Sequence, residues 1–94
     1  PLGTVPALVD GGALLTESSG ICHYLAEKYG PTPLRVAPEE KDYALYLNWM
    51  YRSDATLTFP LTIHFRYTAL EPQERRSAQV AEDYKKWFLG RWTS

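Results

Sequence analysis

The sequence of 94 residues predicts an α/β segment followed by an all-helical segment, and three observations support this fold class. Two short apolar runs, 5–9 and 13–15, are joined by a turn sequence and followed by apolar residues at helical spacing. After residue 38 every apolar pattern has the helical period of three to four residues. Between the two segments, residues 31–38 contain three prolines in eight positions, which is typical of a linker.

The first apolar run is interrupted by Pro6, whose nitrogen cannot donate to a strand ladder. Two interpretations remain open from the residues alone: the run is an edge strand, or the Val5-Pro6 peptide bond is cis. The triplet Asp10-Gly11-Gly12 is typical of a tight turn between two antiparallel strands. We therefore expect a hairpin formed by residues 5–9 and 13–15.

A helix is expected from about residue 16, with its apolar residues on one face and Gly30 as a glycine cap at its end. Its start carries Glu17 and Ser18, where free backbone N–H groups and the positive end of the helix dipole favour an anion. A ligand with both a carboxylate and an ammonium would match this pair. The other interpretation is that Thr16, Ser18 or Ser19 is simply an N-cap residue.

The second segment is expected to contain three helical pieces. Pro38-Glu39-Glu40 places a proline and acidic residues at the start of the first, and Pro60 is expected to kink or end that helix near Leu57. A short helical piece at 61–67 and a last helix starting at 71–74 complete the pattern, with Gly90 near its end.

Composition excludes several classes of function. Ten basic residues against eleven acidic ones, with no basic block longer than Arg75-Arg76, give no support for nucleic-acid binding. No apolar run is long enough to cross a membrane, and no signal peptide is visible. The single cysteine, Cys22, excludes an internal disulfide and is expected to be partly buried as a small apolar residue. No cluster of His, Cys and Asp has ligand spacing, so no metal site is predicted.

The stretch V-P-A-L-V-D-x-G-x-L-L-T-E-S-x-x-I-x-x-Y-L-A-E-K-Y-G resembles the second half of the glutathione-binding domain of cytosolic glutathione transferases. The resemblance is dense over 1–33 and looser over the helical remainder, and Gly20 departs from it because the family usually has alanine there. It implies a partial thioredoxin-like domain at 1–30, a linker at 31–38 and part of an α-helical domain at 39–94. The chain would then be a fragment that begins in the middle of a domain.

The resemblance assigns ligand-binding roles to four residues. Val5, ahead of a cis Pro6, would pair its backbone with the cysteinyl part of glutathione. Glu17 would accept the γ-glutamyl ammonium, and Ser18 would bind the γ-glutamyl carboxylate. Thr4 receives no role, because relatives often have lysine or glutamine at that position.

The function implied by the resemblance is transfer of glutathione to a small apolar electrophile by a cytoplasmic, homodimeric detoxification enzyme. The residue that stabilises the thiolate, a Tyr, Ser or Cys, would lie outside this chain, so no catalytic residue is assigned within it. Two alternatives are a non-catalytic, transferase-like interaction module and a structural helical domain without a ligand.

Overall fold

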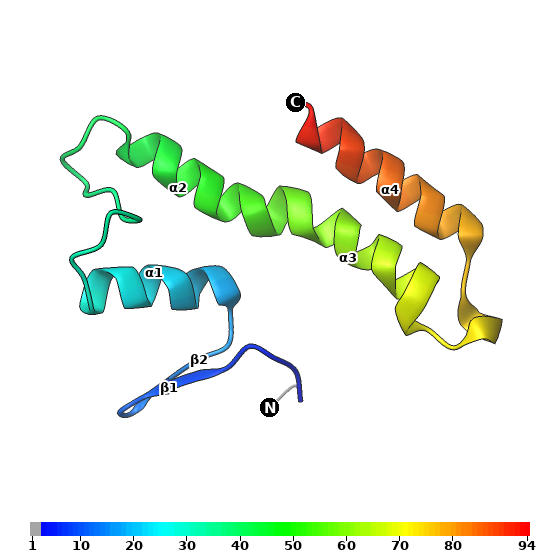
Figure 1. Cartoon of the computed structure of the whole chain (residues 1–94), viewed down its shortest axis with the longest axis horizontal. Helices are drawn as coiled ribbons and strands as arrows, with labels where there is room; N and C mark the ends of the chain where they lie inside the picture. Colours follow the sequence, from blue (N-terminus) through cyan, green and yellow to red (C-terminus); the bar gives the residue numbers. More distant parts are fainter. Residues whose placement is uncertain (1–2) are drawn as a thin grey trace. The chain divides into compact units, whose positions relative to one another are not determined.

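The computed structural model describes residues 3–94 and divides into two compact units, Pro1–Leu47 and Asn48–Ser94 (Figure 1). The first unit contains a two-stranded sheet and helix α1, and the second contains a helical hairpin built from α3 and α4. Helix α2, Tyr43–Arg52, spans the junction between the units. The predicted order, two strands and a helix followed by helices, is the order observed.

The hairpin consists of β1, Leu8–Asp10, and β2, Ala13–Leu15, paired antiparallel with Leu8 opposite Leu15. Gly11 has φ +59, so the predicted turn uses a conformation that glycine adopts without steric cost. The strand predicted at 5–9 was placed too early, because β1 begins at Leu8 and Pro6 lies before it. Proline has no N–H to contribute to the ladder, which accounts for the later start. The predicted cis Val5-Pro6 bond is confirmed, and Gly30-Pro31 is also cis.

Helix α1, Ser18–Lys28, follows directly, and its N-cap residue is Glu17. The Glu17 carbonyl accepts the first helical hydrogen bond from the Ile21 N–H at 2.8 Å, while its side chain makes no capping bond. The alternative that Thr16, Ser18 or Ser19 is the N-cap is therefore wrong.

The end of α1 also differs from the prediction. The C-cap is Tyr29, whose N–H donates to the Leu25 carbonyl, and Gly30 does not have the positive φ of a glycine cap. A Cβ at Gly30 would lie only 2.7 Å from the Ala26 carbonyl oxygen. Glycine is required at this position because of a close backbone approach, which the sequence does not reveal.

In the second unit, α2 continues into the π-helix η1, Ser53–Thr58, and then into α3, Phe59–Phe65. The predicted start at residues 38–40 was too early, because residues 38–42 form turns and α2 begins at Tyr43. Pro60 is buried and directly follows η1 inside a continuous helical stretch, where proline removes a backbone hydrogen bond and its ring crowds the preceding turn. The disturbance predicted near Leu57 is thus a wider helical turn, and the chain stays helical through it.

A second π-helical segment, η2 at Arg66–Leu70, ends α3, and a 3-10 turn, η3 at Gln73–Arg75, leads to α4, Ala78–Trp92. The last helix was predicted to start at 71–74, but the residue that starts α4 is Ser77. Its hydroxyl accepts a hydrogen bond from the Val80 N–H at 3.2 Å, and this bond satisfies a free donor at the helix start. Gly90 lies inside α4 and does not mark its end.

The core of the second unit lies between α3 and α4. Pro60 and Ala81 are its buried residues, and the His64 Nδ1 lies 2.8 Å from the Ala81 carbonyl oxygen. The Phe59 ring packs edge-on against Tyr84 and Trp87, with centroid distances of 6.0 Å to each. Such edge-on aromatic pairs add to the stabilisation that burial alone provides.

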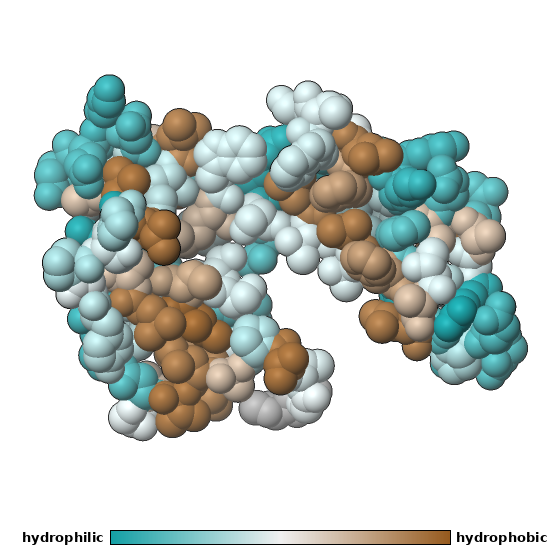
Figure 2. Space-filling model, in the orientation of Figure 1, coloured by the Kyte–Doolittle hydropathy of each residue, from teal (hydrophilic) through white to brown (hydrophobic). Residues whose placement is uncertain are grey.

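Much apolar surface remains exposed in both units. In the strand region, where Figure 2 shows an apolar patch, Val9 is 71% and Leu14 is 56% exposed. Cys22 is exposed as well, so the prediction that it is partly buried was wrong. The helical pattern places it on the side of α1 away from Ile21, Tyr24 and the hairpin contacts.

Candidate ligand-binding site

A cavity of about 580 Å³ lies in the first unit, beside the hairpin, and its volume is in the range usual for small-molecule sites. All four residues predicted to bind the ligand line this cavity: Val5, Pro6, Glu17 and Ser18. The other lining residues are Gly3, Thr4, Ala7, Leu14 and Thr16.

Strand pairing explains why residues 3–7 and 16–18 meet. The two strands run antiparallel with Leu8 opposite Leu15, so the residues before β1 and those after β2 lie at the same end of the hairpin. Helix α1 begins at that end, with Ser18 as its first residue. The cavity is therefore formed by the segment entering the hairpin and by the segment leaving it.

The polar groups of the cavity are few and differ in kind. Among the lining residues that the structure describes, Glu17 is the charged one, and it supplies a carboxylate acceptor. Ser18 supplies a hydroxyl donor at the start of α1, where backbone N–H groups have no partner within the helix. Val5, at 92% exposure, offers its backbone to a partner from solvent. This arrangement can receive a ligand that carries an ammonium and a carboxylate close together.

Five lining residues were not among those predicted to bind the ligand: Gly3, Thr4, Ala7, Leu14 and Thr16. Thr16 could have been found from the sequence, because extending the hairpin register by one position brings residue 16 opposite residue 7. Gly3 has a positive φ of +64, which the neighbouring residues in the sequence do not predict. Thr4, which was given no ligand-binding role, also lines the cavity.

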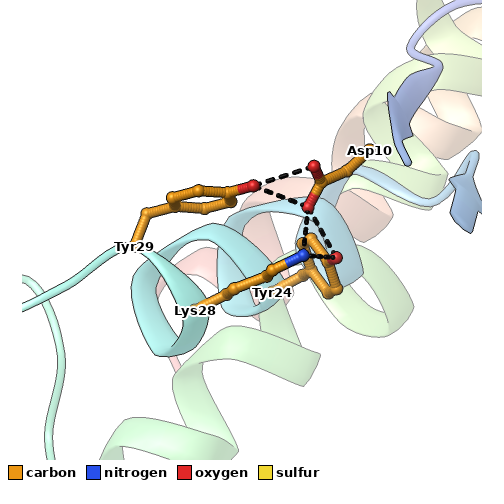
Figure 3. A network of polar contacts seen from close by, with 4 residues as sticks. All are labelled: Asp10, Tyr24, Lys28 and Tyr29. Carbon is orange, nitrogen blue, oxygen red and sulfur yellow. Dashed lines mark hydrogen bonds and ion pairs between the residues drawn. The ribbon is translucent and has the colours of Figure 1, made fainter.

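A second polar cluster ties the turn of the hairpin to the last turn of α1 (Figure 3). The Asp10 carboxylate accepts hydrogen bonds from the Tyr24 hydroxyl and the Lys28 ammonium at 2.7 Å each, and from the Tyr29 hydroxyl at 2.8 Å. The Lys28 ammonium also donates to the Tyr24 oxygen at 3.0 Å. One carboxylate thus holds three side chains from the same helix.

This cluster shifts the pKa values of its members. The hydrogen bond from Lys28, followed by those from Tyr24 and Tyr29, lowers the pKa of Asp10 to about 2. The same carboxylate raises the pKa of Lys28 and that of Tyr29 above their usual values. The cluster holds the hairpin and α1 together, and none of its members lines the cavity.

Within residues 3–94 no three residues of the types His, Cys, Asp and Glu come together as a possible metal site. None of the helices in the same range has both the length and the apolar character needed to span a membrane.

Comparison with known proteins gives one family. Residues 1–33 match the family model described as glutathione S-transferase, N-terminal domain. Glutathione S-transferase hmp2 of Hypomyces subiculosus is 35% identical over 100 aligned residues, which cover 95% of this chain and 46% of the relative. The chain is thus similar to glutathione S-transferases, and most clearly to their N-terminal domain over residues 1–33.

Two other glutathione S-transferases match over shorter stretches. Glutathione S-transferase 3 of Schizosaccharomyces pombe is 42% identical over 60 residues, which are 61% of this chain and 24% of the relative. Glutathione S-transferase Z1 of Arabidopsis thaliana is 56% identical over 34 residues, which are 36% of this chain and 15% of the relative. The chain thus spans less than half the length of these transferases. No solved structure matches it.

The range matched by the family model can be compared with the observed elements. The matched residues contain the hairpin and α1, and the helices beyond them make the chain mostly helical with one small sheet. This arrangement is consistent with part of the glutathione S-transferase fold. The cavity is lined by residues 3–7, 14 and 16–18, all of which fall within the matched range.

Proposed function

We propose that the intact protein is a glutathione transferase and that this chain supplies part of its glutathione site. The observation that supports the proposal is the cavity in the first unit, where Val5, Pro6, Glu17 and Ser18 come together from both sides of the hairpin. The family match over residues 1–33 covers the same residues. A ligand bearing an α-amine and an α-carboxylate satisfies both the Glu17 acceptor and the donors at the start of α1.

In this proposal each residue has one role. The Glu17 carboxylate accepts the γ-glutamyl ammonium, and the Ser18 hydroxyl and N–H bind the γ-glutamyl carboxylate. The Val5 backbone pairs with the cysteinyl part of the tripeptide as an added strand segment. Binding at these points holds the thiol in place for reaction, which is how a positioned substrate lowers an entropic barrier.

The rest of the reaction is assigned to parts of the enzyme outside these residues. A Tyr, Ser or Cys elsewhere would stabilise the thiolate, and an apolar pocket would receive the electrophile. We propose a thioredoxin-like domain that includes residues 1–30, a linker at 31–38 and an α-helical domain that includes residues 39–94. A homodimer acting in detoxification in the cytoplasm completes the proposal.

Calorimetric titration of the intact protein with glutathione tests the site. Ser18→Ala and Glu17→Gln should each weaken binding by roughly 1–3 kcal/mol, because the first removes a hydrogen bond to the ligand carboxylate and the second removes the charge that pairs with the ligand ammonium. Ser53→Ala and Glu82→Gln are matched controls, since they make the same substitutions in the second unit, outside the cavity lining.

The outcomes separate binding from catalysis. Unchanged affinity in both site variants would place the glutathione site elsewhere. Wild-type affinity for glutathione without conjugation of an apolar electrophile would favour the non-catalytic interaction module. Turnover above the uncatalysed rate, reduced in both variants, supports the transferase.

A further inference from the structure

A second cavity, of about 220 Å³, lies in the second unit, on the side of α2 where the π-helix η1 begins. Its lining residues are Asn48, Tyr51, Arg52, Ala55 and Thr56. One of them is a cation, none is acidic, and four carry side-chain hydrogen-bond donors on adjacent turns of α2 and η1. It belongs wholly to the second unit and shares no residue with the glutathione cavity proposed above.

The Arg52 guanidinium is held in place from one side. Its Nη2 donates to the Arg91 carbonyl oxygen at 2.7 Å and to the Ser94 hydroxyl at 3.0 Å. The guanidinium carbon also lies 5.4 Å from the centre of the Trp49 ring, within the range of a cation–π contact. A guanidinium fixed in this way loses little conformational freedom when its other nitrogens bind a ligand.

One nitrogen of Arg52 has no partner. Its Nε is enclosed and has no acceptor among residues 3–94. Enclosed donors without an acceptor are uncommon in folded proteins, and an ion or a water is a usual reason for one. All hydrogen bonds that the guanidinium makes to the described residues come from Nη2, so Nη1, which is not enclosed, is the group open to a ligand.

Two more donors of the same cavity are unused. The Asn48 amide and the Tyr51 hydroxyl form no hydrogen bond with any residue in the described range 3–94. The carbonyl of Thr56, an acceptor at the other side, already receives the Arg91 Nη1 donor at 3.1 Å. The cavity therefore presents one positive charge and several free donors, while one of its acceptors is taken.

We propose that this cavity binds the carboxylate of a small organic anion. A planar carboxylate accepts hydrogen bonds from a guanidinium and from neighbouring amide and phenol donors, and its single charge matches the one cation that lines the cavity. The cavity volume is below that of most drug-sized sites, so the bound group is small. The proposal does not depend on glutathione binding in the first unit.

Acetate is the probe, and the Arg52 Nε–H signal in a nitrogen-15 NMR spectrum of the intact protein is the readout. We expect acetate to shift this signal along a saturable curve with a dissociation constant of about millimolar, relative to chloride at equal ionic strength. The double variant Asn48→Ala, Tyr51→Phe should bind acetate roughly tenfold more weakly, because it loses two donors to a charged group. Both side chains lack other hydrogen-bond partners in residues 3–94, so the variant keeps the fold.

Tyr67→Phe is the matched control, since this tyrosine lies in the second unit, outside the cavity lining, and should leave acetate binding unchanged. The proposal is overturned by a shift that does not exceed the chloride control, or by equal acetate affinity in the wild type and the double variant. Saturable binding of inorganic phosphate without binding of acetate would also overturn the assignment to a carboxylate.

Discussion

Two glycines in or beside α1 differ in the space that a side chain would find at their positions. A Cβ at Gly20 would meet the Glu17 Cβ at 3.8 Å, an ordinary contact, so glycine there is not required by space. A Cβ at Gly30 would lie 2.7 Å from the Ala26 carbonyl oxygen, so the backbone would have to move. The two positions are therefore a matched pair for the same substitution.

We expect Gly30→Ala to lower the free energy of unfolding by roughly 1–3 kcal/mol, the usual cost of forcing an extra methyl group into a filled space. Gly20→Ala should raise it by about 1 kcal/mol, because alanine has the better helix propensity. Denaturant unfolding of the intact protein measures both. Equal effects of the two substitutions would contradict this account.

Two serine hydroxyl groups of the second unit form hydrogen bonds with the backbone, one at the start of a helix and one inside a continuous helical stretch. The Ser77 oxygen accepts from the Val80 N–H and so satisfies a free donor at the start of α4. The Ser53 hydroxyl instead donates to the Met50 carbonyl at 2.7 Å, where α2 passes into η1. The first interaction defines where an element begins, whereas the second adds to a helix that is already continuous.

Ser77→Ala should therefore lower the free energy of unfolding by about 1 kcal/mol, the typical value for loss of an N-cap. Ser53→Ala, the control, should change it by less, since its hydroxyl is exposed and satisfies no free donor of a helix end. Thermal unfolding followed by circular dichroism distinguishes the two. A larger loss for Ser53→Ala than for Ser77→Ala would rule out the capping role.

At the scale of the molecule, the first unit depends on one carboxylate that joins its strand turn to its helix. Asp10 accepts from Tyr24, Lys28 and Tyr29, and its pKa falls to about 2 from an ordinary value of 3.8. A folded-state pKa below the unfolded one stabilises the fold above the unfolded pKa, and this contribution is lost as pH falls through the folded value. The loss is thus confined to the range from about pH 4 to about pH 2.

Asp10→Asn tests this pH dependence. At pH 6 the variant should melt at a lower temperature than the wild type, and the difference should shrink as pH falls from about 4 to 2, where Asp10 becomes protonated. Glu27 serves as the control carboxylate, because Arg35 lowers its pKa too, and Glu27→Gln leaves the Asp10 cluster intact. A difference in melting temperature between wild type and Asp10→Asn that is constant from pH 6 to pH 2 would contradict the role of Asp10.

Because the pKa of Lys28 is raised, its stabilisation of the fold is lost with rising pH, whereas that of Asp10 is lost with falling pH. Its contribution is present below the ordinary value of 10.5 and is lost only as pH rises through the folded-state pKa. Neutral pH is therefore within the range where Asp10 and Lys28 are both charged and paired.

The sequence by itself determined the features that depend on neighbours in the chain. The Asp10-Gly11-Gly12 turn, the second strand and the body of α1 were predicted from local patterns and are present. The cis Val5-Pro6 bond, which the residues alone left open, was expected from the family resemblance and is also present. The four residues assigned to the ligand were also chosen from local motifs and the family resemblance, and the structure brings them to one cavity. Their roles toward glutathione stay a prediction.

Tertiary structure decided what depends on contacts between distant residues. Asp10 is far in sequence from the Lys28 ammonium that it binds, and Thr4 reaches the cavity only because antiparallel pairing returns the chain to the same end. The starts of α2 and α4 were predicted too early, because proline and acidic residues favour a helix start without fixing which residue caps it. Gly30 shows the same limit, since its need for glycine comes from a carbonyl one helical turn away, and only folded backbone geometry places that oxygen within 2.7 Å.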